Sequence, residues 1–163
     1  AGNVIGGGDW ANDRLIPDAI RALYSDKELS IRSPVAIRPW QHVLEPLQGY
    51  ILLAERLYND KDMFVGAWNF GPSDSSNKSV EWIVNYISMR YPEFRLNIDT
   101  GQQLHEANIL KLDSSKSKNT LKWHSKLNLS LALDWTLDWY DANNKDENML
   151  DFCLEQIDKY EEL

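Results

Sequence analysis

The stretch that decides the fold reads IRSPVAIRPWQHVLEPLQGY and covers residues 31–50. Its first residues complete an apolar–polar alternation over Leu29–Arg32, which predicts a short strand, and Ser33-Pro34 ends that strand. From Pro46 to Tyr58 apolar residues recur every three or four positions, which predicts a helix buried on two sides. Strands that alternate with helices in this way indicate an α/β fold.

The same alternation extends to both ends of the chain. Upstream, Val4-Ile5 reads as a short buried strand that runs into three glycines, and Pro17 opens a helix that continues to Tyr24. The glycine loop allows the backbone to approach a ligand closely. Downstream we expect strands near residues 67–70, 96–98 and 109–112, and helices near 80–91, 130–142 and 148–160.

The composition excludes several classes of protein. The 163 residues suffice for one domain with a core, and the net charge of −8 argues against nucleic acid as a partner. No run of about 18 apolar residues predicts a membrane span. Cys153 is the only cysteine, which excludes a disulfide framework and favours the reducing cytoplasm. Because the chain opens on Ala1 in a strand-like pattern, we expect it to be truncated.

Four segments carry a specific resemblance. They read AGNVIGGGDWANDRLIPD (1–18), IRSPVAIRPWQHVLEPLQGY (31–50), GAWNFGP (66–72) and HEANILKLDSSKSKNTLKW (105–123). In this order they resemble nucleotide-sugar 4,6-dehydratases of the CDP-glucose type, within the extended short-chain dehydrogenase/reductase superfamily. The likeness covers nearly the whole chain. The sequence segments RPWQHV (38–43) and GGGDW (6–10) favour CDP-glucose over other sugar nucleotides.

The resemblance implies a fold and an activity. It implies the C-terminal part of an extended short-chain dehydrogenase/reductase: residues 1–5 and 42–71 from the NAD-binding Rossmann domain, and residues 6–41 and 72–163 forming a substrate-binding domain. It implies a cytoplasmic NAD-dependent lyase that converts CDP-glucose to CDP-4-keto-6-deoxyglucose and water, for O-antigen biosynthesis. The intact enzyme is expected to be a homodimer.

The family's catalytic elements are absent from this sequence. Gly6-Gly7-Gly8 does not match the G-x-x-G-x-x-G fingerprint of dinucleotide binding. No tyrosine is followed four residues later by lysine; Tyr24 is followed by Glu28 and Tyr86 by Arg90. We therefore expect no catalytic residue here, an inactive fragment, and NAD bound mainly by a missing N-terminal half.

Arginines are the first candidates for binding a sugar nucleotide, because a guanidinium pairs bidentately with phosphate. Arg38 follows a strand and precedes Pro39, so its backbone is constrained, and the family pattern implies a diphosphate-binding arginine there. Arg32 lies in the same segment and is a weaker candidate. Either arginine could instead be a solvated surface residue. We expect the Arg-Pro-Trp stretch and the loop after the first strand to converge on one ligand.

The remaining candidates lie in loops and at a helix start. The resemblance implies that Asn3 contacts the sugar diphosphate, although a turn-forming asparagine would look the same. Arg14, Leu15 and Ile16 lead into a helix whose free N–H groups suit an anion. Arg14 could instead pair with Asp13 or Asp18. The resemblance also places Glu106 in a loop that contacts the nucleotide.

Other polar and aromatic residues favour packing roles. We expect Trp10 and Trp40 to be core residues, His42 to be a hydrogen-bonded structural group, and no metal site to form. Three alternatives stay open: an epimerase or dehydratase for another nucleotide, a non-catalytic sugar-nucleotide-binding module, and an α/β domain with an unrelated interaction role.

Overall fold

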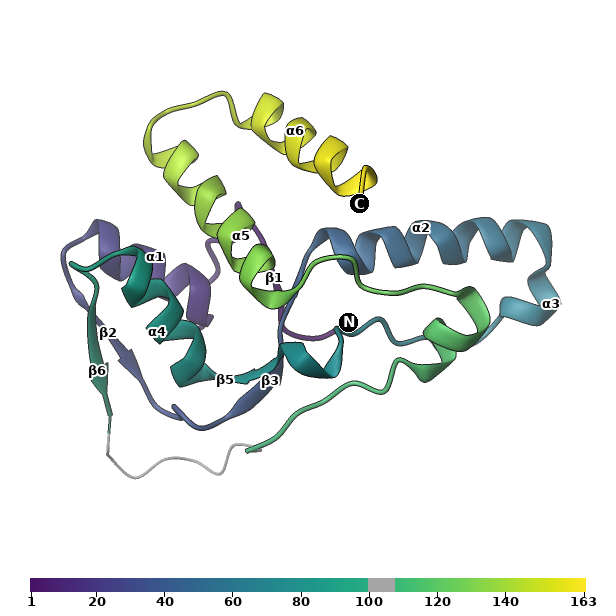
Figure 1. Cartoon of the computed structure of the whole chain (residues 1–163), viewed down its shortest axis with the longest axis horizontal. Coiled ribbons are helices and arrows are strands. Elements are labelled where there is room, and N and C mark those ends of the chain that lie inside the picture. Colours follow the sequence, from purple (N-terminus) through teal and green to yellow (C-terminus); the bar gives the residue numbers. More distant parts are fainter. Residues whose placement is uncertain (100–107) are drawn as a thin grey trace. The chain divides into compact units, whose positions relative to one another are not determined.

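The computed structural model describes residues 1–99 and 108–163, and it has helices interleaved with short strands (Figure 1). The strands are β1 (Val4–Ile5), β2 (Glu28–Ile31), β3 (Ile37–Pro39), β4 (Gln41–His42), β5 (Asn77–Ser79) and β6 (Arg95–Ile98). The helices are α1 (Leu15–Tyr24), α2 (Leu44–Asn59), α3 (Lys61–Phe64), α4 (Val80–Arg90), α5 (Leu129–Asn144) and α6 (Met149–Glu161). A 3-10 turn, η1 (Asp74–Ser76), and a π-helical turn, η2 (Ser117–Leu121), complete the chain. The expected α/β class is confirmed.

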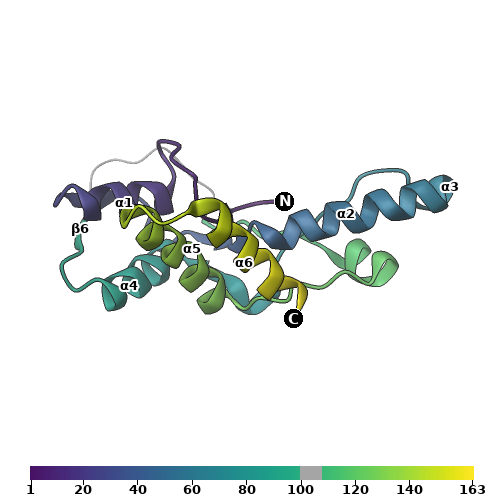
Figure 2. The same ribbon diagram turned by 90° about the horizontal axis from the view of Figure 1, so that it is seen from above.

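The chain divides into two compact units. Unit 1 comprises residues 1–8, 39–76 and 112–163, and unit 2 comprises residues 9–38 and 77–111. In unit 1, β1 pairs in parallel with β4, with Val4 opposite Gln41 and Ile5 opposite His42. Figure 2 shows α5 beside α6, and these helices pack together. The aromatic core of this unit gathers Phe64, Phe70, Leu121 and Trp123.

Unit 2 contains α1, α4 and the strands β2, β3, β5 and β6. β2 pairs in parallel with β6 from Glu28 opposite Arg95 to Ile31 opposite Ile98. Ser79 accepts a hydrogen bond from the Trp82 backbone N–H at 3.2 Å, so Ser79 is the N-cap of α4. The core consists of apolar residues on the inner faces of α1, β2 and α4: Ile16, Ala19, Ile20, Leu29, Ile31, Ile83, Val84 and Ile87.

Two predicted strands are wrong. Residues 67–70 form no strand, because their carbonyls accept bonds from side chains instead of from a neighbouring strand: Lys116 Nζ donates to Ala67 O at 3.0 Å, and Gln41 Nε2 donates to Phe70 O at 2.9 Å. At residues 109–112 the pairing is reduced to one bridge, between Ile37 and Ile109.

Helix α2 forms where the apolar pattern predicts it, but only one side is buried. Its buried residues are Glu45, Pro46 and Gly49. Leu47, Tyr50, Ile51 and Tyr58 form an exposed apolar stripe, and Ile51 is 68% exposed. The prediction of burial on two sides is therefore wrong for the described residues.

Candidate functional site

The start of α1 presents backbone donors. Arg14 precedes the helix in an extended conformation, and no side chain of the described residues caps this end. Leu15 and Ile16 are the first helical residues, and the Ile16 side chain lies in the core. The N–H groups of a first turn have no partner within the helix, so only the backbone of this stretch can meet an anion.

The guanidinium of Arg14 already has an ion pair. Its Nη1 lies 3.0 Å from Asp9 Oδ2. Burial raises the pKa of Asp9, but the hydrogen bond from the Ala11 backbone N–H and the Arg14 guanidinium together hold that pKa below its ordinary value. Neither Asp13 nor Asp18, the two expected alternatives, is its partner here, since Asp18 pairs with Arg21. A ligand phosphate would have to compete with Asp9 for this side chain.

Arg38 lies in β3, which pairs with β5, and its side chain is half-buried. Nη1 donates to the carbonyl of Ile37 at 3.0 Å, which directs one edge of the guanidinium back to its own strand. Pro39 fixes the following backbone. Arg32 directly follows β2 and is exposed. Glu106 lies outside the described residues.

Asn3 adopts the left-handed conformation, with φ of 46°. Asparagine tolerates that conformation better than most residues. Its carbonyl accepts a hydrogen bond from the backbone N–H of Gln41 at 3.3 Å, which extends the β1–β4 pairing by one residue. The side chain is half-buried.

The glycine loop, defined as Gly6–Gly8, packs against protein atoms. A Cβ at Gly6 would lie 2.7 Å from Val43 Cγ1, and a Cβ at Gly7 would lie 1.9 Å from Trp139 Cγ. The sequence predicts a close approach to a ligand, whereas the structure shows a close approach to the Trp139 indole.

Glu45 is a buried carboxylate that ties together three parts of unit 1. Its oxygens accept the backbone N–H groups of Lys126, at 2.9 and 3.1 Å, and Leu127, at 2.6 Å. Oε2 also accepts the Tyr160 hydroxyl at 3.0 Å. Burial raises the pKa of Glu45, and these hydrogen bonds partly offset that effect.

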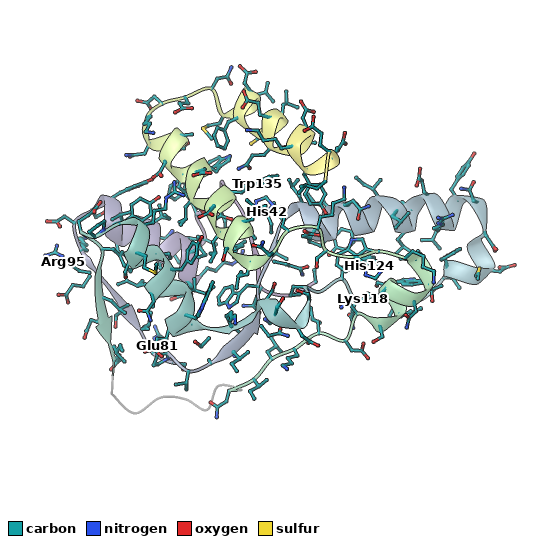
Figure 3. The ribbon with its side chains drawn as sticks, viewed as in Figure 1. His42, Glu81, Arg95, Lys118, His124 and Trp135 are labelled. Atoms are coloured by element: carbon teal, nitrogen blue, oxygen red, sulfur yellow. The ribbon has the colours of Figure 1, made fainter. Side chains whose placement is uncertain are left out.

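His42 is buried, with 2% of its surface exposed. Its ring makes an edge contact with Trp135, with centroids 5.9 Å apart (Figure 3). Nδ1 accepts the Leu44 N–H at 3.4 Å, but Nε2 has no hydrogen-bond partner in the part of the chain that the structure describes. The expectation of a fully hydrogen-bonded histidine is therefore wrong. Burial lowers the pKa of His42 to about 4.

The two tryptophan candidates differ. Trp40 is a core residue, as expected. Trp10 is 45% exposed, so its predicted core role is wrong. It lies in the loop before α1, where its carbonyl accepts a bond from Arg21 Nη1 at 2.9 Å.

Within residues 1–99 and 108–163, no three His, Cys, Asp or Glu side chains gather as a metal site. No helix there is long and apolar enough to cross a bilayer.

The candidate donors and the buried polar residues lie in different units. Arg38, Arg32 and the first turn of α1 supply cationic or N–H donors, whereas Glu45 and His42 are enclosed in the packing of unit 1. Sequence reasoning missed Trp139 and Tyr160. A run of three glycines was the available signal for Trp139, because glycine is also required where a bulky neighbour fills the space of a side chain.

Comparisons with known proteins give a consistent result. No protein-family model matches the chain. It is 45% identical over 161 residues to a CDP-glucose 4,6-dehydratase of Salmonella typhimurium. That match covers 98% of this chain and 45% of the relative, so the chain spans about half the relative's length.

Solved structures share the fold at low sequence identity. A Bacillus cereus UDP-glucuronic acid 4-epimerase in complex with UDP-glucuronic acid and NAD matches with a TM-score of 0.72 and 18% identity, over 86% of this chain and 43% of its own. A dTDP-glucose 4,6-dehydratase of Bacillus anthracis in complex with NAD matches with a TM-score of 0.66 and 19% identity. This match covers 88% of this chain and 44% of the dehydratase chain. TunA, an NAD-dependent NDP-hexosamine 5,6-dehydratase, matches with a TM-score of 0.70 and 17% identity, over 92% of this chain and 45% of the TunA chain.

Proposed function

We propose that this chain, which belongs to the extended short-chain dehydrogenase/reductase superfamily, is the substrate-binding half of a CDP-glucose 4,6-dehydratase. The single observation that carries this proposal is the 45% identity that runs over 98% of the chain. Identity at this level over the whole chain, rather than over one motif, supports a shared ligand. The reaction would convert CDP-glucose to CDP-4-keto-6-deoxyglucose and water, by a lyase that supplies deoxy sugars for surface polysaccharide.

The diphosphate is the part of the ligand that this chain is best suited to bind. Arg38 carries a fixed charge on a strand, and a guanidinium can pair bidentately with phosphate oxygens. The first turn of α1, with Arg14, Leu15 and Ile16, adds backbone donors. Arg32, Asn3 and Glu106 complete the proposed contacts with the sugar nucleotide.

NAD is assigned to the rest of the enzyme. The glycine loop is the candidate for a phosphate cradle here, and it does not fit one, because Val43 and Trp139 occupy the space beside Gly6 and Gly7. Residues 1–5 and 42–71 belong, in this proposal, to the NAD-binding Rossmann domain, and residues 6–41 and 72–163 to the substrate domain. The apolar stripe on α2 is consistent with further packing in a longer protein. The intact enzyme would be a cytoplasmic homodimer.

The experiment uses the full-length protein with NAD and CDP-glucose. The expected product is a 4-keto sugar nucleotide that absorbs in alkali, whereas dTDP-glucose and GDP-mannose give little. The 163-residue chain alone should form no product. A 4-epimer as the product would indicate that the enzyme is an epimerase and not a dehydratase. Equal turnover of all three substrates would contradict the preference for the CDP-sugar. Binding of CDP-glucose by a full-length protein with no turnover would favour the non-catalytic module.

A further inference from the structure

We propose that Trp139, held in place by Cys153, is a positioning residue that fixes the glycine loop and thereby the orientation of Asn3 toward the sugar nucleotide. This inference rests on the proposed function and deepens it. It gives a role to a side chain of α5 that itself touches no ligand in the proposal.

The contact between Trp139 and the loop is continuous. At Gly7, an added Cβ would lie 1.9, 2.1 and 2.4 Å from Trp139 Cγ, Cδ2 and Cδ1, which are atoms of the five-membered ring. At Gly8, it would lie 3.5 Å from Cζ2 and Cη2, at the far end of the six-membered ring. The loop therefore runs along the length of the indole. Gly8 has a positive φ of 77°, so the turn itself also favours glycine.

Val43 holds the other end of the loop. Its Cγ1 would lie 2.7 Å from a Cβ at Gly6, and its N–H donates to the carbonyl of Ile5 at 2.8 Å. The backbone leaving β1 is thus held first by Val43 and then by Trp139. Any side chain at Gly7 would have to displace the indole.

The indole is itself fixed by two neighbours. Nε1 donates to Cys153 Sγ at 3.2 Å, which joins α5 to α6. The ring also makes an edge contact with the buried Tyr140, with centroids 5.4 Å apart and planes at 83°. A ring held by a hydrogen bond and an aromatic contact is a rigid surface for the loop.

The position of Asn3 depends on this support, because β1 is only two residues long. On its upstream side, Gln41 holds the chain by two long bonds, from its N–H to Asn3 O at 3.3 Å and from its Nε2 to Gly2 O at 3.4 Å. The downstream anchor is Val43 with Trp139. Removing the indole would let β1 shift and Asn3 lose its orientation. Such a loss weakens ligand binding in the ground and transition states alike, so it raises KM and leaves kcat largely unchanged.

The test measures kcat and KM for CDP-glucose in the full-length protein. Trp139→Ala and Gly7→Ala should each raise KM about tenfold with kcat within about threefold. Trp139→Phe keeps an aromatic face against Gly7 but loses the bond to Cys153, so its KM should lie between those of the wild type and Trp139→Ala. The double variant should raise KM by less than the product of the two, because a methyl group at position 7 fits the space that the indole vacates. Trp68→Ala is the control, because it removes a half-buried tryptophan of unit 1 that stacks on Phe64, and it should leave KM unchanged. An unchanged KM with a lower kcat in Trp139→Ala indicates only a smaller folded fraction and would overturn the inference.

Amide hydrogen exchange without ligand separates this inference from the proposed function. Exchange at residues 3–8 should be faster in Trp139→Ala than in the wild type, with the rate in Trp139→Phe between the two. If the wild type turns over no CDP-glucose, the proposed function fails, and the exchange rates alone then decide whether Trp139 fixes the loop. Unchanged exchange in Trp139→Ala would overturn the inference in either case.

Discussion

The Tyr160 hydroxyl donates a hydrogen bond to Glu45 Oε2 at 3.0 Å, across 115 residues of sequence. Tyr160 ends the buried part of α6, and Glu45 lies in the first turn of α2. Both side chains are almost wholly buried, and Glu45 is 1% exposed. A carboxylate at this depth is tolerated because every bond it accepts replaces one to water. This pair therefore fastens α6 to the rest of unit 1.

Tyr160→Phe should lower the free energy of unfolding by roughly 1–3 kcal/mol, since it removes one donor to a buried charge. Glu45→Gln should cost more, because an amide cannot accept from Tyr160, Lys126 and Leu127 as a carboxylate does. Urea denaturation measures both effects. In the Glu45→Gln background, Tyr160→Phe should cost less than it does alone. Tyr58→Phe is the control, because Tyr58 is 92% exposed. Equal losses in Tyr160→Phe and Tyr58→Phe would mean that the hydrogen bond does not stabilise the fold.

His42 predicts a loss of stability in acid. Its pKa is about 4 in the folded chain, against an ordinary value of 6.5, so the unfolded state binds a proton first as the pH falls. Above pH 6.5 this group contributes no pH dependence, and between 6.5 and 4 the free energy of unfolding falls. The full loss is roughly 3 kcal/mol, at about 1.4 kcal/mol for each pH unit of the difference.

The measurement compares unfolding free energies of His42→Gln and the wild type across this pH range. In His42→Gln the free energy of unfolding should depend less steeply on pH than in the wild type. His124→Gln, at an exposed position, should show the same pH dependence as the wild type. Parallel curves for His42→Gln and the wild type would show that His42 is protonated equally in both states.

Local features of the fold were predictable from the sequence, because they depend on neighbouring residues. Asn148, where the last helix was expected to start, accepts the N–H of Leu150 at 3.1 Å, and Ser79 caps α4, which begins at Val80 where a helix was expected. Each of these bonds joins residues two or three positions apart. The resemblance to nucleotide-sugar dehydratases was also recognisable, because several sequence segments occur in the same order as in that family.

Contacts between residues that are far apart in the sequence could not be predicted from it. Nothing local to Glu45 indicates Tyr160, and nothing local to Gly7 indicates Trp139. The apolar pattern of α2 specifies which residues prefer burial but not what covers them, so the prediction of two buried sides was wrong. The proposed ligand contacts of Asn3, Arg32 and Arg38 stay predictions, and Glu106 lies outside the described residues.

Arg38→Ala should raise KM for CDP-glucose about tenfold or more in the full-length enzyme, with kcat little changed. A diphosphate bound equally in the ground and transition states contributes to KM rather than to kcat. Arg38→Lys keeps the charge but loses the bidentate geometry, so its KM should lie between those of the wild type and Arg38→Ala. Arg32→Ala, at an exposed position, should have a smaller effect. An unchanged KM in Arg38→Ala would remove this residue from the site.

The apolar stripe on α2 predicts how the 163-residue chain behaves when it is made alone. Burying one such side chain contributes about 1.5–3 kcal/mol, and a whole domain is stable by only about 5–15 kcal/mol. The isolated chain should therefore be marginally stable and prone to association, as judged by light scattering and thermal unfolding. Ile51→Lys should reduce association, because Ile51 is 68% exposed, whereas Val35→Lys, at an exposed apolar residue of unit 2, should reduce it less. In the full-length protein the effect should reverse, and Ile51→Lys should destabilise the fold where this face is covered. A cooperative melt at high temperature from a monomeric isolated chain would contradict the argument, because it would mean that this face needs no further packing.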